Sequence, residues 1–182
     1  MTFALKCLGA LLAVATGAQA LATEVQVAVA ANFAAPMHKI AAAFERDTGH
    51  KAVLSVGATG KFYAQIRHGA PFAVLLAADD ETPARLQKEG LAAAGSAFTY
   101  AIGQLVLWSA DNAAVDAQGA VLNAPLSGRL ALADPKLAPY GAAALQVLQQ
   151  RGLVDKLRPH FVLGENIAQT FQFVKTGNAS MG

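Results

Sequence analysis

The sequence predicts an α/β protein of two lobes, in which doubly wound parallel sheets leave a ligand cleft between the lobes. Three observations support this fold class. Apolar strands alternate with amphipathic helices along residues 25–90, which is typical of a parallel sheet covered on both faces. The same alternation resumes over residues 129–175, after a long apolar stretch. Small polar turns join each strand to the next helix, and parallel sheets bind ligands at that end of their strands.

The stretch from Val25 to Phe44 shows the pattern most clearly. β-Branched residues at every second position of its first part predict a buried strand. Apolar residues at helical spacing then predict a helix, with Asn32 as its N-cap and Pro36 in its first turn. The free N–H groups of such a helix start attract anions without any cationic side chain. An ordinary strand–helix unit with a good cap explains the same residues.

Two further strand–helix units follow in the first lobe. Residues 51–56 predict the second strand, and Thr59 is expected to cap the helix after it. Residues 72–78 predict a third buried strand, and Asp79 and Asp80 lie at the start of the following helix. We expect these two carboxylates to stabilise the helix dipole rather than to bind a metal or carry out acid–base chemistry.

The second lobe is expected after residues 98–108, an apolar stretch that predicts a long strand crossing between the lobes. Residues 129–133 and 161–163 predict two short buried strands, and helices are expected over 142–151 and 167–175. Each of these helices follows a polar turn. The two lobes thus supply four helix N-termini, and a cleft between the lobes would let all four reach one ligand.

The N-terminal residues 1–22 are expected to be a cleaved signal peptide. Lys6 supplies a positive start, and residues 8–14 form an apolar core too short to span a bilayer. An uncleaved membrane anchor is the rival interpretation. The single cysteine, Cys7, lies inside this segment, so the mature chain would have no disulfide, thiol nucleophile or zinc–thiolate site. We therefore expect secretion to a bacterial periplasm.

The remaining chain divides into a first lobe over residues 23–100 and a second lobe over residues 101–182. The chain ends at Gly182 in a turn, where a strand returning to the first lobe would be expected. We therefore expect a C-terminal segment to be missing from both lobes, and a shortened copy without a stable function is one alternative.

Composition and motifs exclude several classes of function. The net charge is +2 with only 14% charged residues, and no basic run is present, so nucleic-acid binding is not expected. The four histidines have no partners at metal-ligand spacing, so no metal site is expected. No known catalytic motif or nucleophile–base pair is present, so we expect neither an enzyme nor a cofactor.

Four segments of the sequence together form a recognisable set: AVAANFAAPM, SVGATGKFYAQIRHGAPFAVLLAADD, ADPKLAPYG and GENIAQTFQFV. In this order they resemble the periplasmic molybdate-binding proteins of ABC transporters. The resemblance implies a type II periplasmic-binding fold, a molybdate or tungstate oxyanion held between the lobes, and a membrane permease as partner. It also implies binding without catalysis, and we expect a monomer.

The resemblance further implies which residues bind the oxyanion. Two serines of the family correspond to Asn32, which keeps a polar donor, and to Thr59, which keeps the hydroxyl. Ala58 and Gly60 flank the second of these. The family's backbone donors in the second lobe correspond to Tyr140 and Ile167. Molybdenum would be bound as molybdate at these six residues, so no side chain is expected to ligate a metal cation.

Several alternatives stay open at this point. Because Asn32 departs from the family pattern, sulfate, phosphate or a small carboxylate could be the ligand instead of molybdate. An enzyme on the same fold is another possibility, since fold alone does not decide function. Tyr140 could donate its hydroxyl or simply pack on Pro139. Lys61, at the start of the second helix, is expected to point into water rather than toward an anion, because a cation opposes the helix dipole there.

Overall fold

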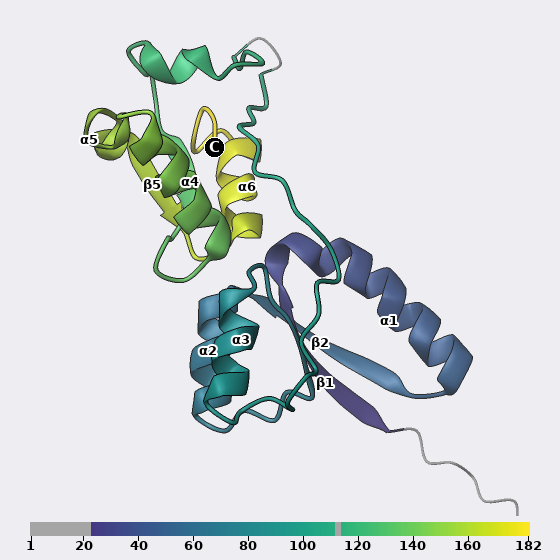
Figure 1. The fold of residues 1–182 in the computed structure, drawn as a ribbon. Helices are drawn as coiled ribbons and strands as arrows, with labels where there is room; N and C mark the ends of the chain where they lie inside the picture. Colours follow the sequence, from purple (N-terminus) through teal and green to yellow (C-terminus); the bar gives the residue numbers. More distant parts are fainter. Residues whose placement is uncertain (1–22, 112–113) are drawn as a thin grey trace, which may run out of the picture.

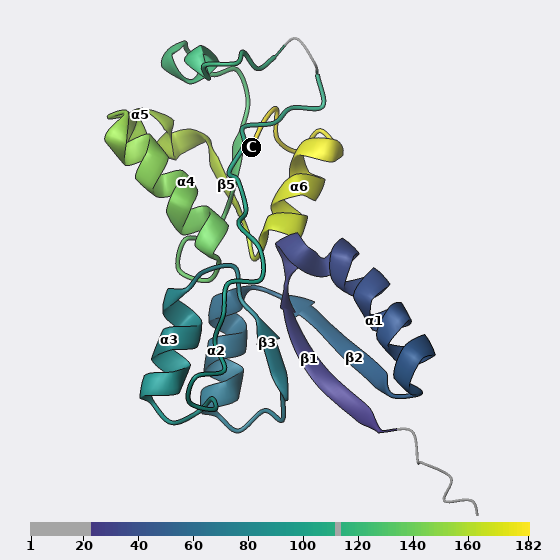
Figure 2. The same ribbon diagram turned by 45° about the vertical axis from the view of Figure 1, so that its right-hand side comes forward.

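The computed structural model describes residues 23–111 and 114–182, which form two lobes joined by an extended segment (Figures 1 and 2). The predicted signal peptide of residues 1–22 lies outside the described residues. The α/β class and the two-lobed arrangement predicted from the sequence are confirmed. Among the described residues, no helix is long and apolar enough to cross a membrane.

The first lobe is built on a parallel sheet of three strands in the order β2-β1-β3. β1 (Glu24–Ala30) is central, with β2 (Lys51–Gly57) on one side and β3 (Val74–Leu76) on the other. The last four residues of β1 are buried, because helices cover both faces of the sheet. β3 is shorter than the predicted strand over 72–78, since only three of its residues pair with β1.

Three helices cover this sheet, with α1 on one face and α2 and α3 on the other (Figure 2). A short 3-10 turn, η1 (Ala31–Phe33), leads into α1 (Ala34–Thr48). α2 spans Thr59–Arg67 and α3 spans Glu81–Lys88. All three helices begin on the side of the sheet that faces the second lobe (Figure 2). This places three strand-to-helix turns of the first lobe next to the cleft.

Two predicted helix caps are wrong. Asn32 lies inside η1, and Phe33, the residue before α1, makes no side-chain cap. Thr59 is the first residue of α2, and Ala58 takes the N-cap position without a side-chain hydrogen bond. The reason is the same in both units. Each strand runs into a helical turn with at most one residue between them, so the polar residue falls inside the turn rather than before it.

The segment of residues 91–108 carries the chain from the first lobe to the second (Figure 2). The sequence predicted this crossing correctly. The long strand predicted over 98–108 is wrong: these residues form no strand, because a strand needs a hydrogen-bonding neighbour. Among residues 98–108, all of which are described, only Trp108 pairs its backbone, with Gly182. Apolar side chains therefore remain exposed along the segment, and Ile102 is 91% exposed.

The second lobe contains two parallel strands, β4 (Leu130–Ala133) and β5 (Phe161–Gly164). α4 (Pro139–Gln150) and α5 (Val154–Leu157) lie on one side of the strands, and α6 (Ile167–Lys175) lies on the other (Figure 2). Two 3-10 turns complete the lobe: η2 (Ala120–Asn123) and η3 (Arg158–His160).

Two helices of the second lobe can be compared with the bounds predicted from the sequence. α6 has the bounds that its sequence pattern predicted. α4 begins three residues before its predicted start at residue 142, because Pro139 fits the first helical position, where no N–H is needed. The core of the second lobe is a cluster of buried apolar side chains from most of its elements. Its buried members are Leu122, Leu130, Leu132, Leu148, Leu153, Leu157 and Met181.

Candidate functional site

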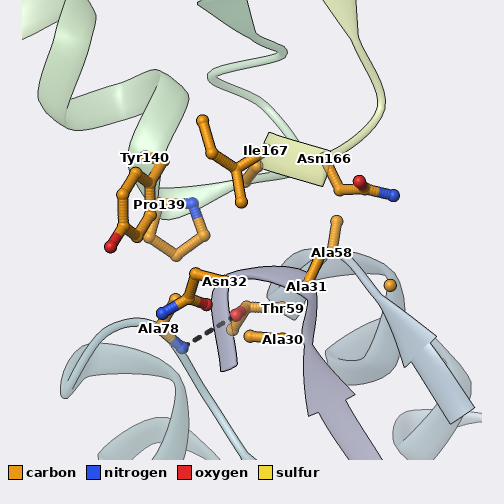
Figure 3. Close-up of a pocket in the computed structure, with 12 residues that line it drawn as sticks. Ala30, Ala31, Asn32, Ala58, Thr59, Ala78, Pro139, Tyr140, Asn166 and Ile167 are labelled. Carbon is orange, nitrogen blue, oxygen red and sulfur yellow. Dashed lines mark hydrogen bonds between the residues drawn. The ribbon is translucent and has the colours of Figure 1, made fainter. Parts of the chain in front are cut away.

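A pocket lies between the two lobes, at the ends of the strands where the helices begin (Figure 3). Its volume is about 10 Å³, which is near the lower limit for holding one water-sized group. In this arrangement of the lobes, the pocket therefore has room for no more than about one water-sized group. Its lining residues are Ala30, Ala31, Asn32, Gly57, Ala58, Thr59 and Ala78 of the first lobe, and Ala138, Pro139, Tyr140, Asn166 and Ile167 of the second.

Four helix starts meet at this pocket. The first lobe supplies η1, which leads into α1, and the start of α2; the second lobe supplies the starts of α4 and α6. Each helix start carries partial positive charge, because its first N–H groups have no partner within the helix. None of the twelve lining side chains is charged. The positive potential of the pocket therefore comes from the backbone.

At the starts of α2, α4 and α6, the backbone N–H groups of Thr59, Tyr140 and Ile167 line the pocket, and no acceptor for them is found among the described residues. Thr59 and Ile167 are the first residues of α2 and α6. Tyr140 is the first residue of α4 that can donate, because Pro139 ahead of it has no N–H. Both lobes thus contribute free donors to one small space.

α6 differs from the other helix starts at the pocket because a side chain caps it. The Asn166 Oδ1 atom accepts a hydrogen bond from the Gln169 N–H at 3.1 Å. Figure 3 shows this side chain pointing away from the other lining residues. The cap satisfies an N–H deeper in the helix, and the N–H of Ile167 stays available at the pocket.

Thr59 brings a hydroxyl into the pocket from the first lobe. The side chain is only 1% exposed, and its Oγ1 atom accepts a hydrogen bond from the Ala78 N–H at 3.0 Å (Figure 3). Because the oxygen already accepts this bond, its own proton is free to be donated to a group in the pocket. Burial and this fixed contact give the hydroxyl a defined place.

Asn32 and Tyr140 are the other polar side chains that sequence analysis placed in the site. The Asn32 amide lies on the pocket side of η1 (Figure 3), and no described residue bonds to it. The Tyr140 ring lies beside Pro139 (Figure 3). Its hydroxyl lies against Gly103 in the segment between the lobes: a Cβ added at Gly103 would be 2.8 Å from the Tyr140 hydroxyl oxygen. Packing thus directs the hydroxyl toward that segment, and the backbone N–H remains the donor at the pocket.

Gly60 and Ala58, the neighbours of Thr59, have different positions. Ala58 lines the pocket, but Gly60 does not. The Gly60 N–H instead donates to the Leu137 carbonyl of the second lobe at 2.9 Å. A Cβ added at Gly60 would also lie 2.9 Å from that carbonyl oxygen. Gly60 therefore lets the two lobes approach each other closely beside the pocket.

Lys61 bridges the two lobes next to this backbone contact. Its Nζ atom lies 2.7 Å from Oε2 of Glu165, in the turn before α6. Lys61 does not line the pocket, and the pair is partly exposed, with side chains 41% and 60% accessible. Lys61 thus lies outside the pocket and partly in water, and a carboxylate of the opposite lobe also pairs with it.

Sequence reasoning missed several lining residues because they have no polar side chain. Ala31 and Ala78 lie at the carboxyl ends of β1 and β3, and Ala138 precedes α4. Their position at strand ends was the available signal, because ligands of parallel sheets bind there. Asn166 was recognised only as part of a polar turn.

Comparison with known proteins assigns this chain to a family. Residues 25–182 match the family described as bacterial extracellular solute-binding protein. The chain belongs to this family. The match covers both lobes and all of the residues that line the pocket.

Two relatives are similar in sequence over most of the chain. The molybdate-binding protein ModA of Azotobacter vinelandii is 60% identical over 163 residues, which are 90% of this chain and 65% of the relative. The protein of the same name from Rhodobacter capsulatus is 52% identical over 163 residues, or 90% of this chain and 64% of the relative. The chain thus spans just under two thirds of the length of these relatives.

Solved structures support the fold. A periplasmic molybdate-binding protein of Azotobacter vinelandii matches with a TM-score of 0.83 at 42% identity, over 87% of this chain and 69% of the other. A substrate-binding domain of a putative molybdenum ABC transporter from Clostridium difficile matches with a TM-score of 0.55 at 24% identity, over 88% of this chain and 70% of that domain. The second likeness concerns the fold alone. The type II periplasmic-binding fold predicted from the sequence is confirmed.

Proposed function

We propose that this protein binds molybdate or tungstate between its lobes and delivers the oxyanion to the membrane permease of an ABC importer. The observation that carries the proposal is the meeting of four helix starts at one small pocket without a charged side chain. The names of the relatives from Azotobacter vinelandii and Rhodobacter capsulatus supply molybdate as the ligand to test first.

The donors at the pocket match a fully deprotonated oxyanion. Such an anion accepts hydrogen bonds through every oxygen and donates none. The pocket offers the N–H groups of Thr59, Tyr140 and Ile167, the Thr59 hydroxyl and the Asn32 amide. Helix starts stabilise negative charge through their N–H groups and dipoles, so no lysine or arginine is required.

Size would separate molybdate and tungstate from sulfate. The larger oxyanions can contact donors of both lobes at once, whereas a smaller one leaves some of these donors unpaired. Each buried donor left without a partner costs about 1–3 kcal/mol. A difference of one or two contacts is therefore enough for strong preference.

Delivery would depend on how the lobes close around the ligand. The Gly60 N–H and the Lys61 side chain contact the second lobe directly beside the pocket. A bound oxyanion would add contacts to both lobes and favour a closed arrangement, which a permease can distinguish from an open one. The protein would act in the periplasm, as a monomer, without a cofactor and without catalysing a reaction.

Thermal unfolding in the presence of four anions tests the proposal. A ligand at a hundred times its dissociation constant stabilises a protein by about 2.7 kcal/mol, which shifts the melting temperature by several degrees. We expect such a shift with molybdate and with tungstate, and none with sulfate or phosphate at the same concentration. A shift with sulfate or phosphate alone would keep an oxyanion site and replace the ligand. No shift with any of the four would contradict the proposal.

A further inference from the structure

Tyr100, in the segment between the lobes, makes a hydrogen bond that reaches toward the pocket. Its hydroxyl donates to the Ala77 carbonyl at 2.7 Å. Its ring packs edge-on against Phe33 of η1, with 4.8 Å between the ring centroids. Tyr100 is 37% exposed and does not line the pocket. It is therefore held in place by two parts of the first lobe.

The acceptor of this bond belongs to the same peptide unit as the donor to Thr59. The Ala77 carbonyl and the Ala78 N–H are the two ends of one planar peptide group. The Ala78 N–H donates to Oγ1 of Thr59 at 3.0 Å. One peptide group thus connects the hydroxyl of Tyr100 to the hydroxyl of Thr59.

We propose that Tyr100 is a positioning residue that fixes the Thr59 hydroxyl as a donor toward the ligand, acting through the Ala77–Ala78 peptide group. The proposal rests on the proposed function and extends the site to a residue of the segment between the lobes. With both ends of the peptide group bonded, the Ala78 N–H stays directed at Thr59, and the Thr59 proton points away from it.

The direction of the bonds favours donation at the pocket. Tyr100 donates to the peptide carbonyl, the peptide N–H donates to Thr59, and Thr59 would donate to an oxyanion. Hydrogen bonds that run in one direction polarise and strengthen one another. Burial, and to a smaller extent the nearby Tyr140, raises the pKa of Tyr100. Its hydroxyl therefore keeps the proton that this arrangement requires.

The segment between the lobes contacts both sides of the pocket in this way. Tyr100 bonds to the first lobe, and Gly103 lies against the hydroxyl of Tyr140 from the second lobe. A movement of the lobes relative to this segment would therefore change the support of Thr59.

The test compares Tyr100→Phe with Tyr63→Phe. Both variants lose one phenolic hydroxyl and keep the ring, but Tyr63 bonds to Glu89 on the outer surface of α2 and α3, away from the pocket. By isothermal calorimetry with molybdate, we expect Tyr100→Phe to raise the dissociation constant about three- to tenfold. Tyr63→Phe should leave it unchanged.

A double-mutant cycle separates positioning from a general structural effect. In a Thr59→Val background, Tyr100→Phe should have no further effect on the dissociation constant, because the hydroxyl that it orients is gone. In a Thr59→Ser background the effect should persist. An equal effect of Tyr100→Phe in all three backgrounds would overturn the proposal.

A measurement without ligand keeps the inference separate from the proposed function. Hydrogen exchange of the Ala78 amide, followed by NMR, should be faster in Tyr100→Phe and unchanged in Tyr63→Phe. Unchanged exchange of Ala78 in Tyr100→Phe overturns the inference, whatever the ligand proves to be. If the wild-type chain binds none of the four anions, the proposed function fails, and faster exchange of Ala78 still supports the connection from Tyr100 to Thr59.

Discussion

The helix starts at the pocket and those elsewhere in the chain satisfy their N–H groups in different ways. At the start of α3, which does not itself line the pocket, the Asp79 carboxylate accepts from the Thr82 N–H at 2.8 Å. The Asp116 carboxylate accepts from the N–H groups of Ala120 and Val121 at the start of η2. At the pocket, η1, α2 and α4 have no side-chain cap, and neither they nor α6 have an acidic residue in the first turn.

The difference is that the pocket lacks a negative charge of its own at its helix starts. Every helix start presents N–H groups that favour negative charge. At α3 and η2, the chain supplies that charge itself through an aspartate. At the pocket, small residues such as Ala58 and Ala138 occupy the N-cap positions, so the donors remain for a ligand.

The largest effect is expected from placing a carboxylate in the pocket. Ala31→Asp would give the pocket the negative charge that the outer helix starts have. At a separation of about 5 Å, repulsion of a second negative charge amounts to about 3 kcal/mol, so oxyanion affinity should fall by about a hundredfold or more. Ala31→Asn is the neutral control and should retain most of the affinity in calorimetry. Equal loss in both variants would show that size at residue 31, rather than charge, is responsible.

Removing the hydroxyl of Thr59 should have the next largest effect. Thr59→Val deletes a buried donor, and we expect oxyanion binding to weaken by about 1–3 kcal/mol. The Ala78 N–H also loses its acceptor, so the melting temperature should fall. Thr59→Ser keeps the hydroxyl and should restore most of the affinity. An unchanged dissociation constant in Thr59→Val would remove this residue from the site.

Separating the lobes should weaken binding without touching the pocket lining. In Gly60→Ala, the added Cβ would lie 2.9 Å from the Leu137 carbonyl oxygen, which is closer than such contacts allow. We expect the lobes to close less completely, and oxyanion affinity to fall about tenfold or less. Small-angle scattering with saturating molybdate should show a larger radius of gyration than for the wild type. Wild-type scattering and affinity would contradict the role of this contact in closure.

Breaking the ion pair between the lobes should have a small effect. In Lys61→Met the contact to Glu165 is lost, but partly exposed pairs of this kind contribute about 0–1 kcal/mol. Affinity should change less than about fivefold at low salt, and the difference should shrink at high salt because ions screen the pair. A loss of a hundredfold would mean that Lys61 contacts the anion itself.

The smallest effect concerns a capped helix start and its pH dependence. Hydrogen bonds from the N–H groups of Ala120 and Val121 lower the pKa of Asp116. A lowered pKa in the folded state contributes stability above the ordinary aspartate value of about 4, and this stability is lost as pH falls through the folded-state value. The urea midpoint of the wild type should therefore fall more steeply than that of Asp116→Asn between about pH 5 and pH 2. Parallel curves would contradict this assignment.

Much of the fold was predictable, because apolar periodicity and turn residues act locally. The alternation of strands and helices and the bounds of α6 followed from the sequence pattern, and the other helix starts at the pocket were predicted to within three residues. The strand predicted over residues 98–108 failed, because strand formation depends on a neighbour that local sequence cannot reveal.

The site was predictable in its parts but not in its contacts. Asn32, Thr59, Tyr140 and Ile167 were placed at helix starts from polar turns and from family resemblance, and all of them line the pocket. The roles of Gly60 and of other residues that join the lobes depend on distances between distant segments. Those distances arise only when the chain folds, so they cannot be predicted from the spacing of residues in the sequence.

The central claim is that the helix starts at the pocket, where no carboxylate accepts from the N–H groups, bind the anion. The helix starts at which an aspartate accepts from the N–H groups do not. NMR spectra of the backbone amides with and without molybdate test it most directly. We predict the largest shifts at the N–H groups of Thr59, Tyr140 and Ile167, and little change at Thr82 and Val121, whose N–H groups donate to carboxylates. Binding with shifts of similar size at both sets, or at Thr82 and Val121 alone, would contradict the account.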